Sequence, residues 1–528
     1  MSASPTTYTP RLLRTRLPKL CIAVTGTDAT DMIEKAEALV RDYPLIEFRL
    51  DYLKDPATAF PKLKRLLEMY SGVTAIATCR RAANGGRFKG SVAAQVSVLL
   101  KAAACGCQMI DVELQTADVL KPADFERLRS KSLLILSHHD LKQTKRLQEI
   151  FGRMREYPAD LFKIVTTATS LHDNVVMMKF LQEYSDRFQM IGLCMGEQGL
   201  ISRVLSVRAG SVFTFASVNP GEETAPGQIP ARELRDTYRI ETVDAATRVY
   251  GVVGDPISHS LSPIMMNAAF RRENVNAVFV GLHAKNIEDV LACVKDTPIH
   301  GLSVTMPYKQ EIVEYLDNTD PLTQKVGACN TVVRSVEGKI YGFNTDVAGV
   351  IAPLEHRLTL SGAKVLVLGA GGAARAAVFG LKARQAEVFI LNRTTATAQK
   401  LARQAGAKLI KRADLKKLSF DVIVNATSVG MGNTKSSPLE QKEIKARYVF
   451  DLVYNPIQTR FMKLAEAEGA TVIGGLEMFV QQGARQFEIW TAKPAPVDEM
   501  RYVVARELQQ RSAEEVAGMN GKPTKAKK

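Results

Sequence analysis

The strongest constraint on the fold is a series of eight short apolar runs, separated by helix-like stretches, in the first half of the chain. The runs begin at Cys21, Leu45, Val73, Met109, Leu133, Asp160, Gln189 and Val212. Their apolar residues are continuous rather than alternating, which is typical of strands buried on both faces of a sheet. Eight such strands alternating with helices predict a (β/α)8 barrel.

A different set of elements follows the charged, helix-permissive stretch that ends at Arg248. Strands are expected at 249–253, 277–281 and 301–305, and a strand, a glycine turn and a helix are expected within 364–382. The chain is therefore predicted to be an α/β protein of two unrelated parts. The expected divisions are a disordered tail (1–18), the barrel (19–238), a linker (239–248), a substrate-binding lobe (249–346, completed by 475–510), a Rossmann lobe (347–474) and a basic tail (511–528).

Composition narrows the functional class. The chain has 528 residues and a net charge of +15, but its basic residues are dispersed without the aromatic interleaving that is typical of nucleic-acid binding, so small anionic substrates are favoured. No run approaches the roughly 18 apolar residues of a membrane span, which predicts a soluble, cytoplasmic chain. The basic N-terminus faintly resembles an organelle transit peptide, although a disordered tail is favoured. The seven cysteines are expected to be reduced core residues, and no metal site is expected.

Polar residues of the first half stand where a barrel enzyme needs them. Arg49, Arg80 and His139 end their strands, and Lys163 lies inside the sixth apolar run. Burial of a lysine disfavours its ammonium form and favours a nucleophilic amine, whereas snorkelling or pairing with a carboxylate such as Glu47 or Asp111 is the structural alternative. Taken together, these residues suggest Schiff-base chemistry on an anionic carbonyl compound.

Six segments of this half resemble type I 3-dehydroquinate dehydratase: EFRLD (47–51), TCR (78–80), SHHD (137–140), FKI (162–164), MGEQGLISR (195–203) and ETAPGQI (223–229). The resemblance implies that Lys163 forms an imine with the substrate ketone and that His139 transfers the proton. It implies substrate contacts from Glu47, Arg49, Arg80, Arg203, Thr224 and Gln228. The family usually has an acidic residue where this chain has Asn84, which predicts a slower dehydratase with a shifted pH optimum.

The segment KVLVLGAGGAARAAVFGLK (364–382) indicates dinucleotide binding. Gly369 permits the tight turn, Gly371 and Gly372 allow close backbone approach, and the following helix N-terminus receives the pyrophosphate. The next strand ends in Asn392, Arg393 and Thr394, where an NAD enzyme commonly has an acidic residue. Arginine and threonine suit a 2′-phosphate and predict NADP, unless Arg393 is only a solvated strand-end residue.

Four loops of the second half carry hydroxyls, an amide, a lysine and a carboxylate: HSLSP (259–263), SVTMPYK (303–309), GACNT (327–331) and GFNTD (342–346). This half resembles shikimate dehydrogenase, which implies that Lys309 and Asp346 are the catalytic pair. The implied shikimate contacts are Ser260, Ser262, Thr305, Asn330, Asp346, Tyr454 and Gln482. The implied NADP contacts are Gly369, Ala370, Gly371, Gly372, Ala373, Asn392, Arg393, Thr394, Thr427, Met431 and Gly475.

The pairing of these halves resembles the fused dehydratase–dehydrogenase of plants and some bacteria. It implies dehydration of 3-dehydroquinate followed by reduction of 3-dehydroshikimate to shikimate, with small molecules as the partners. Two alternatives stay open: a quinate dehydrogenase in the second half, and a barrel that serves only as a binding module. Sequence does not decide channelling or oligomeric state.

Overall fold

The computed structural model describes residue 11 and residues 17–257, 260–296, 299–433 and 435–520. The chain forms two compact units, residues 1–247 and 248–528. Most of the two predicted tails lies outside the described residues. Within the N-terminal one, Arg11 donates a hydrogen bond to the Asp160 carboxylate and Leu17 is buried in the core of the first unit. In the C-terminal one, a helix continues through residues 511–520.

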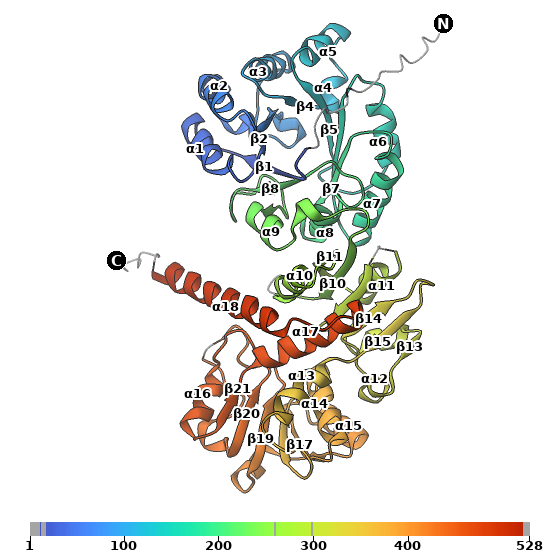
Figure 1. The fold of residues 1–528 in the computed structure, drawn as a ribbon, viewed down its shortest axis with the longest axis vertical. Coiled ribbons are helices and arrows are strands. Elements are labelled where there is room, and N and C mark those ends of the chain that lie inside the picture. Colours follow the sequence, from blue (N-terminus) through green and yellow to red (C-terminus); the bar gives the residue numbers. More distant parts are fainter. Residues whose placement is uncertain (1–10, 12–16, 258–259, 297–298, 434, 521–528) are drawn as a thin grey trace. The chain divides into compact units, whose positions relative to one another are not determined.

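The first unit contains one curled, parallel sheet (Figure 1). Its strands are β1 (Leu20–Val24), β2 (Leu45–Arg49), β3 (Thr74–Thr78), β4 (Met109–Glu113), β5 (Leu133–His139), β6 (Leu161–Thr167), β7 (Met190–Met195), β8 (Thr214–Ser217) and β9 (Ile229–Pro230). The strand order is β7-β6-β5-β4-β3-β2-β1-β8-β9. The eight predicted strands are confirmed. β9 was not predicted, because a two-residue strand has no periodicity to detect.

In the described residues, strand pairing does not continue around the full circumference of the curled sheet. No pairing of β7 with β8 occurs in the described sheet, but the backbone N–H of Val212 donates to the carbonyl of Met190 over 2.8 Å. That bond links the segment entering β8 to the start of β7. The architecture of the first unit is therefore barrel-like, as expected.

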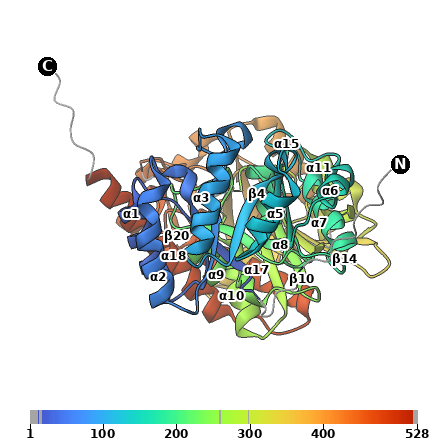
Figure 2. The same ribbon diagram turned by 90° about the horizontal axis from the view of Figure 1, so that it is seen from above.

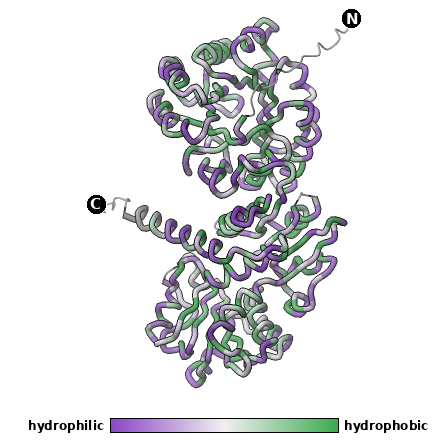
Figure 3. The backbone as a smooth tube through the Cα atoms, in the orientation of Figure 1, coloured by the Kyte–Doolittle hydropathy of each residue, from purple (hydrophilic) through white to green (hydrophobic). Residues whose placement is uncertain are grey.

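The helices of the first unit lie outside its strands (Figure 1). They are α1 (Ala29–Leu39), α2 (Phe60–Met69), α3 (Val92–Ala104), α4 (Leu114–Ala117), α5 (Pro122–Arg129), α6 (Leu147–Met154), α7 (His172–Tyr184), α8 (Leu200–Leu205) and α9 (Ala231–Asp236). Helix α1 begins where Asp28 caps the backbone N–H groups of Thr30 and Asp31. Helices α3 and α5 are neighbours on the outer surface (Figure 2). Helices of both units alternate between hydrophobic and hydrophilic residues (Figure 3), as amphipathic helices do.

Strand alternation decides which side chains enter the barrel. The interior core contains apolar residues of strands β1 to β8, including Leu45, Met109 and Leu161 at the start of their strands. Because side chains of a strand alternate between its faces, the residues two positions further along also point inward. Those residues include Glu47, Asp111 and Lys163, so the predicted site residues lie directly above an apolar floor.

The second unit begins with a mixed six-stranded sheet of order β11-β10-β12-β14-β15-β13. The strands are β10 (Arg248–Gly254), β11 (Ala277–His283), β12 (Ile299–Val304), β13 (Asn318–Thr319), β14 (Thr331–Arg334) and β15 (Ile340–Phe343). The accompanying helices are α10 (Ser262–Arg272), α11 (Ile287–Asp296), α12 (Pro321–Val326), α17 (Gly475–Thr491) and α18 (Val497–Asn520). Helices α10, α17 and α18 share one core through Phe270, Phe487 and Val504. The end of the chain therefore packs on the lobe that begins at β10.

The remaining sheet is parallel, with the order β18-β17-β16-β19-β20-β21. Its strands are β16 (Lys364–Leu368), β17 (Glu387–Leu391), β18 (Lys408–Leu409), β19 (Phe420–Asn425), β20 (Ala446–Asp451) and β21 (Thr471–Ile473). Its helices are α13 (Asp346–Glu355), α14 (Gly372–Ala383), α15 (Thr395–Ala405) and α16 (Arg460–Ala467). The strand order reverses between β16 and β19, and ligands of such sheets bind at the carboxyl edge of that point. This confirms the predicted Rossmann fold.

Two further expectations concern the chain as a whole. None of the seven cysteines, all of which are described, forms a disulfide, and six of them are buried, which agrees with reduced core residues. Among the described residues, no helix combines the length and the apolar character that a membrane crossing requires.

Candidate active sites

Lys163 is held between two carboxylates inside the barrel. Its side chain is 4% exposed, and its Nζ lies 2.9 Å from Asp111 Oδ2 and 3.3 Å from Glu47 Oε1. The same nitrogen lies 4.1 Å from the centre of the Phe215 ring. The pairing that the sequence left as an alternative is therefore present with both acids. Both buried carboxylates lie within reach of the ammonium group and can accept a proton from it. A nucleophilic amine can therefore form without a base from solvent.

The two carboxylates are themselves held by hydroxyl groups of neighbouring strands. Thr78 Oγ1 donates to Glu47 over 2.7 Å, and Ser137 Oγ donates to Asp111 over 2.5 Å. Burial is the largest single influence and would raise the pKa of each acid, but the positive charges of Lys163 and Arg80, with the other favourable contacts, together outweigh it and hold the pKa of both Glu47 and Asp111 below its ordinary value. Both acids are therefore ionised at neutral pH.

His139 ends β5 at the mouth of the barrel. Its Nδ1 is buried and has no hydrogen-bond partner among the described residues. Burial, followed by the charges of Arg80 and Lys163, lowers the pKa of His139 well below its ordinary value. A neutral imidazole can accept a proton, so this ring suits a general base. The Nδ2 of Asn84 is also buried without a partner in the described structure.

Arg203 is a buried cation without a carboxylate partner. It is 1% exposed, its Nη2 donates to the carbonyl of Pro226 over 2.9 Å, and its Nε has no partner. No described acidic residue forms an ion pair with it, and burial lowers its pKa to about 10. A buried guanidinium in this state suits an anionic ligand. Arg80 Nε and Nη2 have no hydrogen-bond partner in the described structure, but Nη2 forms an ion pair with Asp111 Oδ2 at 3.6 Å, and Arg49 is paired with Asp51 over 2.9 Å.

The loop that carries Thr224 and Gln228 folds over the end of β7. The backbone N–H of Thr224 donates to Gln228 Oε1 over 2.8 Å. Gly227 has a φ of +72°, and a Cβ there would lie 2.5 Å from the carbonyl oxygen of Gly196. Only glycine fits this approach, which explains why the loop sequence contains Pro-Gly. The loop also supplies the Pro226 carbonyl that Arg203 contacts.

The predicted pair of the second unit is also in contact. Lys309 Nζ lies 2.5 Å from Asp346 Oδ2, and Asn330 Nδ2 donates to Asp346 Oδ1 over 2.8 Å. The backbone N–H of Thr345 donates to Asn330 Oδ1 over 2.7 Å. The carboxylate is thus fixed from two sides, and the lysine can deliver a proton to a nearby oxygen.

The other predicted substrate contacts come from separate elements. Ser260 accepts a hydrogen bond from the backbone N–H of Ser262, at the start of α10. Thr305 directly follows β12, and its N–H donates to the Val253 carbonyl over 3.0 Å. Tyr454 stacks on Phe479 of α17 with 4.5 Å between ring centres, and burial raises the pKa of Tyr454.

Gln482, the last predicted substrate contact, lies one helical turn after Phe479 and approaches the Asn330 amide at 3.5 Å. Helix α17 therefore links the Tyr454 region to the Asn330–Asp346 pair. The motif residue His259 lies outside the described residues.

The predicted dinucleotide loop lies at the carboxyl ends of neighbouring strands. Leu368 pairs with Leu391 and with Asn425, so β16, β17 and β19 end together. A Cβ at Gly369 would lie 2.9 Å from the Ala426 carbonyl oxygen, and one at Gly372 would lie 3.2 Å from Lys309 Cδ. The glycines therefore keep a cradle open directly beside the predicted catalytic lysine.

The remaining predicted cofactor contacts surround this cradle. Asn392, Arg393 and Thr394 follow β17, and Asn392 Nδ2 donates to the Thr394 carbonyl over 3.0 Å. After β19, Thr427 Oγ1 donates to Asn425 Oδ1 over 2.7 Å, and Met431 is 51% exposed.

Several residues that hold the site were not predicted. Asp51, Thr78 and Ser137 lie two positions from Arg49, Arg80 and His139 respectively, so strand alternation could have identified them. Gln486 binds Ser303 Oγ over 3.0 Å and Thr331 Oγ1 over 3.1 Å, and only the tertiary structure reveals this contact.

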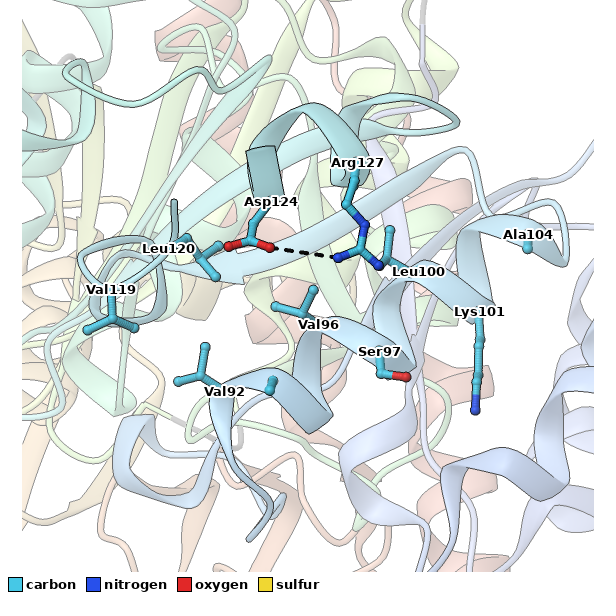
Figure 4. Close-up of a pocket in the computed structure, with 11 residues that line it drawn as sticks. Val92, Val96, Ser97, Leu100, Lys101, Ala104, Val119, Leu120, Asp124 and Arg127 are labelled. Atoms are coloured by element: carbon cyan, nitrogen blue, oxygen red, sulfur yellow. Dashed lines mark ion pairs between the residues drawn. The ribbon is translucent and has the colours of Figure 1, made fainter. Parts of the chain in front are cut away.

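No group of His, Cys, Asp and Glu in the described part of the chain is arranged to hold a metal ion. A hollow of about 580 Å³ lies between α3 and α5 on the outer surface of the barrel (Figure 4). Valines and leucines line it, and an Asp124–Arg127 ion pair of 3.8 Å lies beside it. It contains none of the predicted site residues.

Models of known protein families match the two units of the chain separately. The profile of type I 3-dehydroquinase matches residues 20–245. The profile of the shikimate dehydrogenase substrate binding domain matches residues 252–332, that of shikimate / quinate 5-dehydrogenase residues 353–472, and that of the shikimate 5'-dehydrogenase C-terminal domain residues 475–504.

Similar proteins include one that spans both units. The chain is 35% identical, over 91% of its length and 83% of the relative, to the chloroplastic bifunctional 3-dehydroquinate dehydratase/shikimate dehydrogenase of Arabidopsis thaliana. It is 38% identical to the shikimate dehydrogenase (NADP(+)) of Pyrococcus furiosus, over 51% of this chain and 99% of that protein. A solved structure of shikimate 5-dehydrogenase from Thermus thermophilus, with NADP(H) and shikimate, has 34% identity, coverage of 49% and 99%, and a TM-score of 0.47.

Proposed function

Because the chain belongs to the family of bifunctional 3-dehydroquinate dehydratase/shikimate dehydrogenases, we propose that its two units catalyse their reactions through the residues described above. The first unit is a lyase that converts 3-dehydroquinate to 3-dehydroshikimate. The second is an NADP-dependent oxidoreductase that reduces 3-dehydroshikimate to shikimate. The observation that carries the residue assignments is that each unit holds a lysine in direct contact with a carboxylate, Lys163 buried and Lys309 partly buried.

In the dehydratase, Lys163 attacks the ketone carbon of the substrate. Asp111 or Glu47 accepts a proton from Nζ, at 2.9 Å and 3.3 Å, and the carbonyl oxygen leaves as water to form the imine. His139 then removes a proton from the carbon next to the imine and returns a proton to the departing hydroxyl, which leaves as water. Hydrolysis of the conjugated imine releases the product and restores the amine.

The charge of the dehydratase substrate is met by the arginines. Arg203 has no acidic partner among the described residues, so it is the cation best suited to the substrate carboxylate. The residues proposed to hold the remaining oxygens of the substrate are Glu47, Arg49, Arg80, Thr224 and Gln228.

The lowered pKa of His139 should extend the dehydratase activity to acidic pH. The ring must be neutral to accept the proton, and its pKa lies well below the ordinary 6.5, so the dehydratase should keep its kcat/KM from neutral pH down to below pH 6.5. Asn84→Asp adds a carboxylate near Arg80, offsets part of that lowering and should move the acid limb to higher pH. A pH profile of both proteins checks this, and identical acid limbs would contradict the role of position 84.

In the dehydrogenase, Lys309 protonates the carbonyl oxygen of 3-dehydroshikimate while Asp346 and Asn330 hold the lysine and the substrate hydroxyls. NADPH supplies the hydride when bound. The cradle that a Cβ would fill at Gly369 and Gly372 fits the pyrophosphate of such a cofactor. The residues proposed to hold it are Gly369, Ala370, Gly371, Gly372, Ala373, Asn392, Arg393, Thr394, Thr427, Met431 and Gly475.

Arg393 is proposed to select NADPH over NADH. Arg393→Met should lower kcat/KM for NADPH roughly 10- to 100-fold, since a charge-assisted contact to the 2′-phosphate is lost, while kcat/KM for NADH changes little. Arg403→Met, in the last turn of α15, is the matched control on an exposed arginine. Equal losses with both cofactors would show that Arg393 does not contact the 2′-phosphate.

A coupled assay tests the bifunctional assignment. The purified chain receives 3-dehydroquinate and NADPH, and both the enone absorbance of 3-dehydroshikimate and the loss of NADPH are followed. Consumption of NADPH from 3-dehydroquinate is expected. Loss of NADPH only when 3-dehydroshikimate is supplied directly would mean that the barrel is a binding module. Oxidation of quinate in preference to shikimate by NADP would instead favour a quinate dehydrogenase.

We propose a cytoplasmic location for this chain, on the absence of a membrane-spanning helix among its described residues. The Arabidopsis relative is chloroplastic by name. Fusion of residues 1–18 to a fluorescent reporter separates the two locations, because import of the reporter into an organelle would contradict the proposal.

A further inference from the structure

Ser217, the last residue of β8, has a buried hydroxyl without a partner. The side chain is fully buried, and its Oγ has no hydrogen-bond partner in the described structure. A buried polar group that lacks a partner costs stability, so native proteins rarely keep one unless a ligand or an ordered water meets it. Neither the family resemblance nor the proposed mechanism uses this residue.

The direction of the Ser217 side chain follows from the sheet. Phe215 of β8 belongs to the interior core of the barrel, as does Phe213 just before the strand, so alternation places Ser217 on the same inward face. The strand register leads to the same conclusion about Ser217, because Ala23 of β1 pairs with Glu47 on one side and with Ser217 on the other. Glu47, Ala23 and Ser217 therefore form one row across three strands.

The row of Glu47, Ala23 and Ser217 includes a direct contact of the Lys163 amine. Glu47 contacts Lys163 Nζ at 3.3 Å, and the Phe215 ring, one inward position before Ser217, lies 4.1 Å from the same nitrogen. Ser217 is thus above the Phe215 ring, toward the mouth of the barrel. In the described structure, Arg80, His139 and Arg203, which are proposed to meet the substrate, also have buried polar atoms without a hydrogen-bond partner.

We propose that Ser217 is a further substrate-binding residue of the dehydratase, whose hydroxyl forms a hydrogen bond with a ring hydroxyl of 3-dehydroquinate. A serine hydroxyl both donates and accepts, which suits a polyol better than the arginines do. The inference rests on the dehydratase activity proposed for the barrel. It gives the substrate pocket a contact from β8, on the side of Lys163 where Phe215 supplies only an apolar surface.

Steady-state kinetics of Ser217→Ala test the contact. KM for 3-dehydroquinate should rise roughly five- to tenfold, the effect of one neutral hydrogen bond, with kcat within twofold. Thr214→Val is the matched control, because Thr214 is also a buried β8 residue with an unpartnered hydroxyl but lies on the opposite face of the strand. Its KM should not change. Shikimate dehydrogenase activity, measured on the same chains, reports that the second unit is intact, and circular dichroism and the melting temperature report whether the barrel is folded.

Thermal unfolding separates a binding role from a structural one. Without ligand, Ser217→Ala should melt no lower than the wild type, since no hydrogen bond is lost, while 3-dehydroshikimate should raise its Tm less than that of the wild type. An unchanged KM, or a KM change accompanied by a lower Tm of the free protein, would overturn the proposal. If the wild type lacks dehydratase activity, the proposed function fails, and the ligand-induced Tm shifts still decide whether Ser217 contacts the ring.

Discussion

Replacement of Lys163 by methionine is expected to abolish dehydration of 3-dehydroquinate while reduction of 3-dehydroshikimate by the same chain continues unchanged. The loss should be roughly 10⁴-fold or more, because the residue is the only covalent nucleophile of the proposed mechanism. Borohydride treatment in the presence of substrate, followed by mass spectrometry, should give an adduct on the wild type and none on the variant. An adduct on Lys163→Met would show that another amine forms the imine.

A second variant guards against a folding defect, because methionine leaves Glu47 and Asp111 buried without their cation. Lys163→Arg keeps the positive charge and both ion pairs, but a guanidinium stays protonated and cannot form the imine. It should also be inactive as a dehydratase. Normal dehydrogenase activity in both variants confirms that the second unit is intact, and a wild-type circular dichroism spectrum and melting profile confirm that the barrel is folded. Substantial dehydratase activity in the arginine variant would exclude the Schiff-base role.

The second large effect is expected at Lys309 of the dehydrogenase. Lys309→Met should lower kcat for 3-dehydroshikimate reduction roughly 10²- to 10⁴-fold, the range in which general acids act, with dehydratase activity unchanged. Asp346→Asn keeps the shape of the contact at 2.5 Å but removes its charge, and a smaller loss is expected. Stopped-flow measurement of NADPH oxidation checks both variants.

The loss of activity in Lys309→Met is expected mainly in kcat and not in KM. Lys309 is proposed to act on the reacting oxygen, so kcat should fall more than KM rises. Affinity for NADPH should stay within about threefold, since the Lys309 atoms that lie nearest to Gly372 are carbons of its side chain, which methionine largely retains. A variant with wild-type kcat and a raised KM would make Lys309 a binding residue rather than the proton donor. Lys325→Met, at the end of α12, is a control for the loss of a lysine charge in the same lobe.

Local patterns were sufficient for the two architectures. The strands of the barrel are short, mostly apolar runs, and burial on both faces produces that pattern wherever the strand lies in the sheet. The glycine loop between β16 and α14 is similarly local, because a φ of +114° at Gly369 and the start of a helix at Gly372 involve only neighbouring residues. A two-residue strand such as β9 has no such pattern, and it was missed.

Contacts between distant residues could not be predicted from such patterns. Lys163 is separated by 116 residues from Glu47 and by 52 from Asp111, and the sequence offered these acids only as possible partners. Whether one, both or neither binds the amine depends on the register of the five adjacent strands β2 to β6. The same holds for Gln486, whose three hydrogen bonds cross 155 to 183 residues of sequence.

The sequence by itself thus determined the family, the order of the elements and the residue types at each strand end, since these depend on local periodicity and on motifs. The tertiary structure decided which charges are paired and which are not. Arg49 is neutralised by Asp51, whereas Arg203 is buried without an acid, and nothing in the spacing of the two arginines distinguishes them. The physical reason is that hydrogen bonds and ion pairs depend on distances of a few ångströms between side chains, and register across the folded sheet sets those distances.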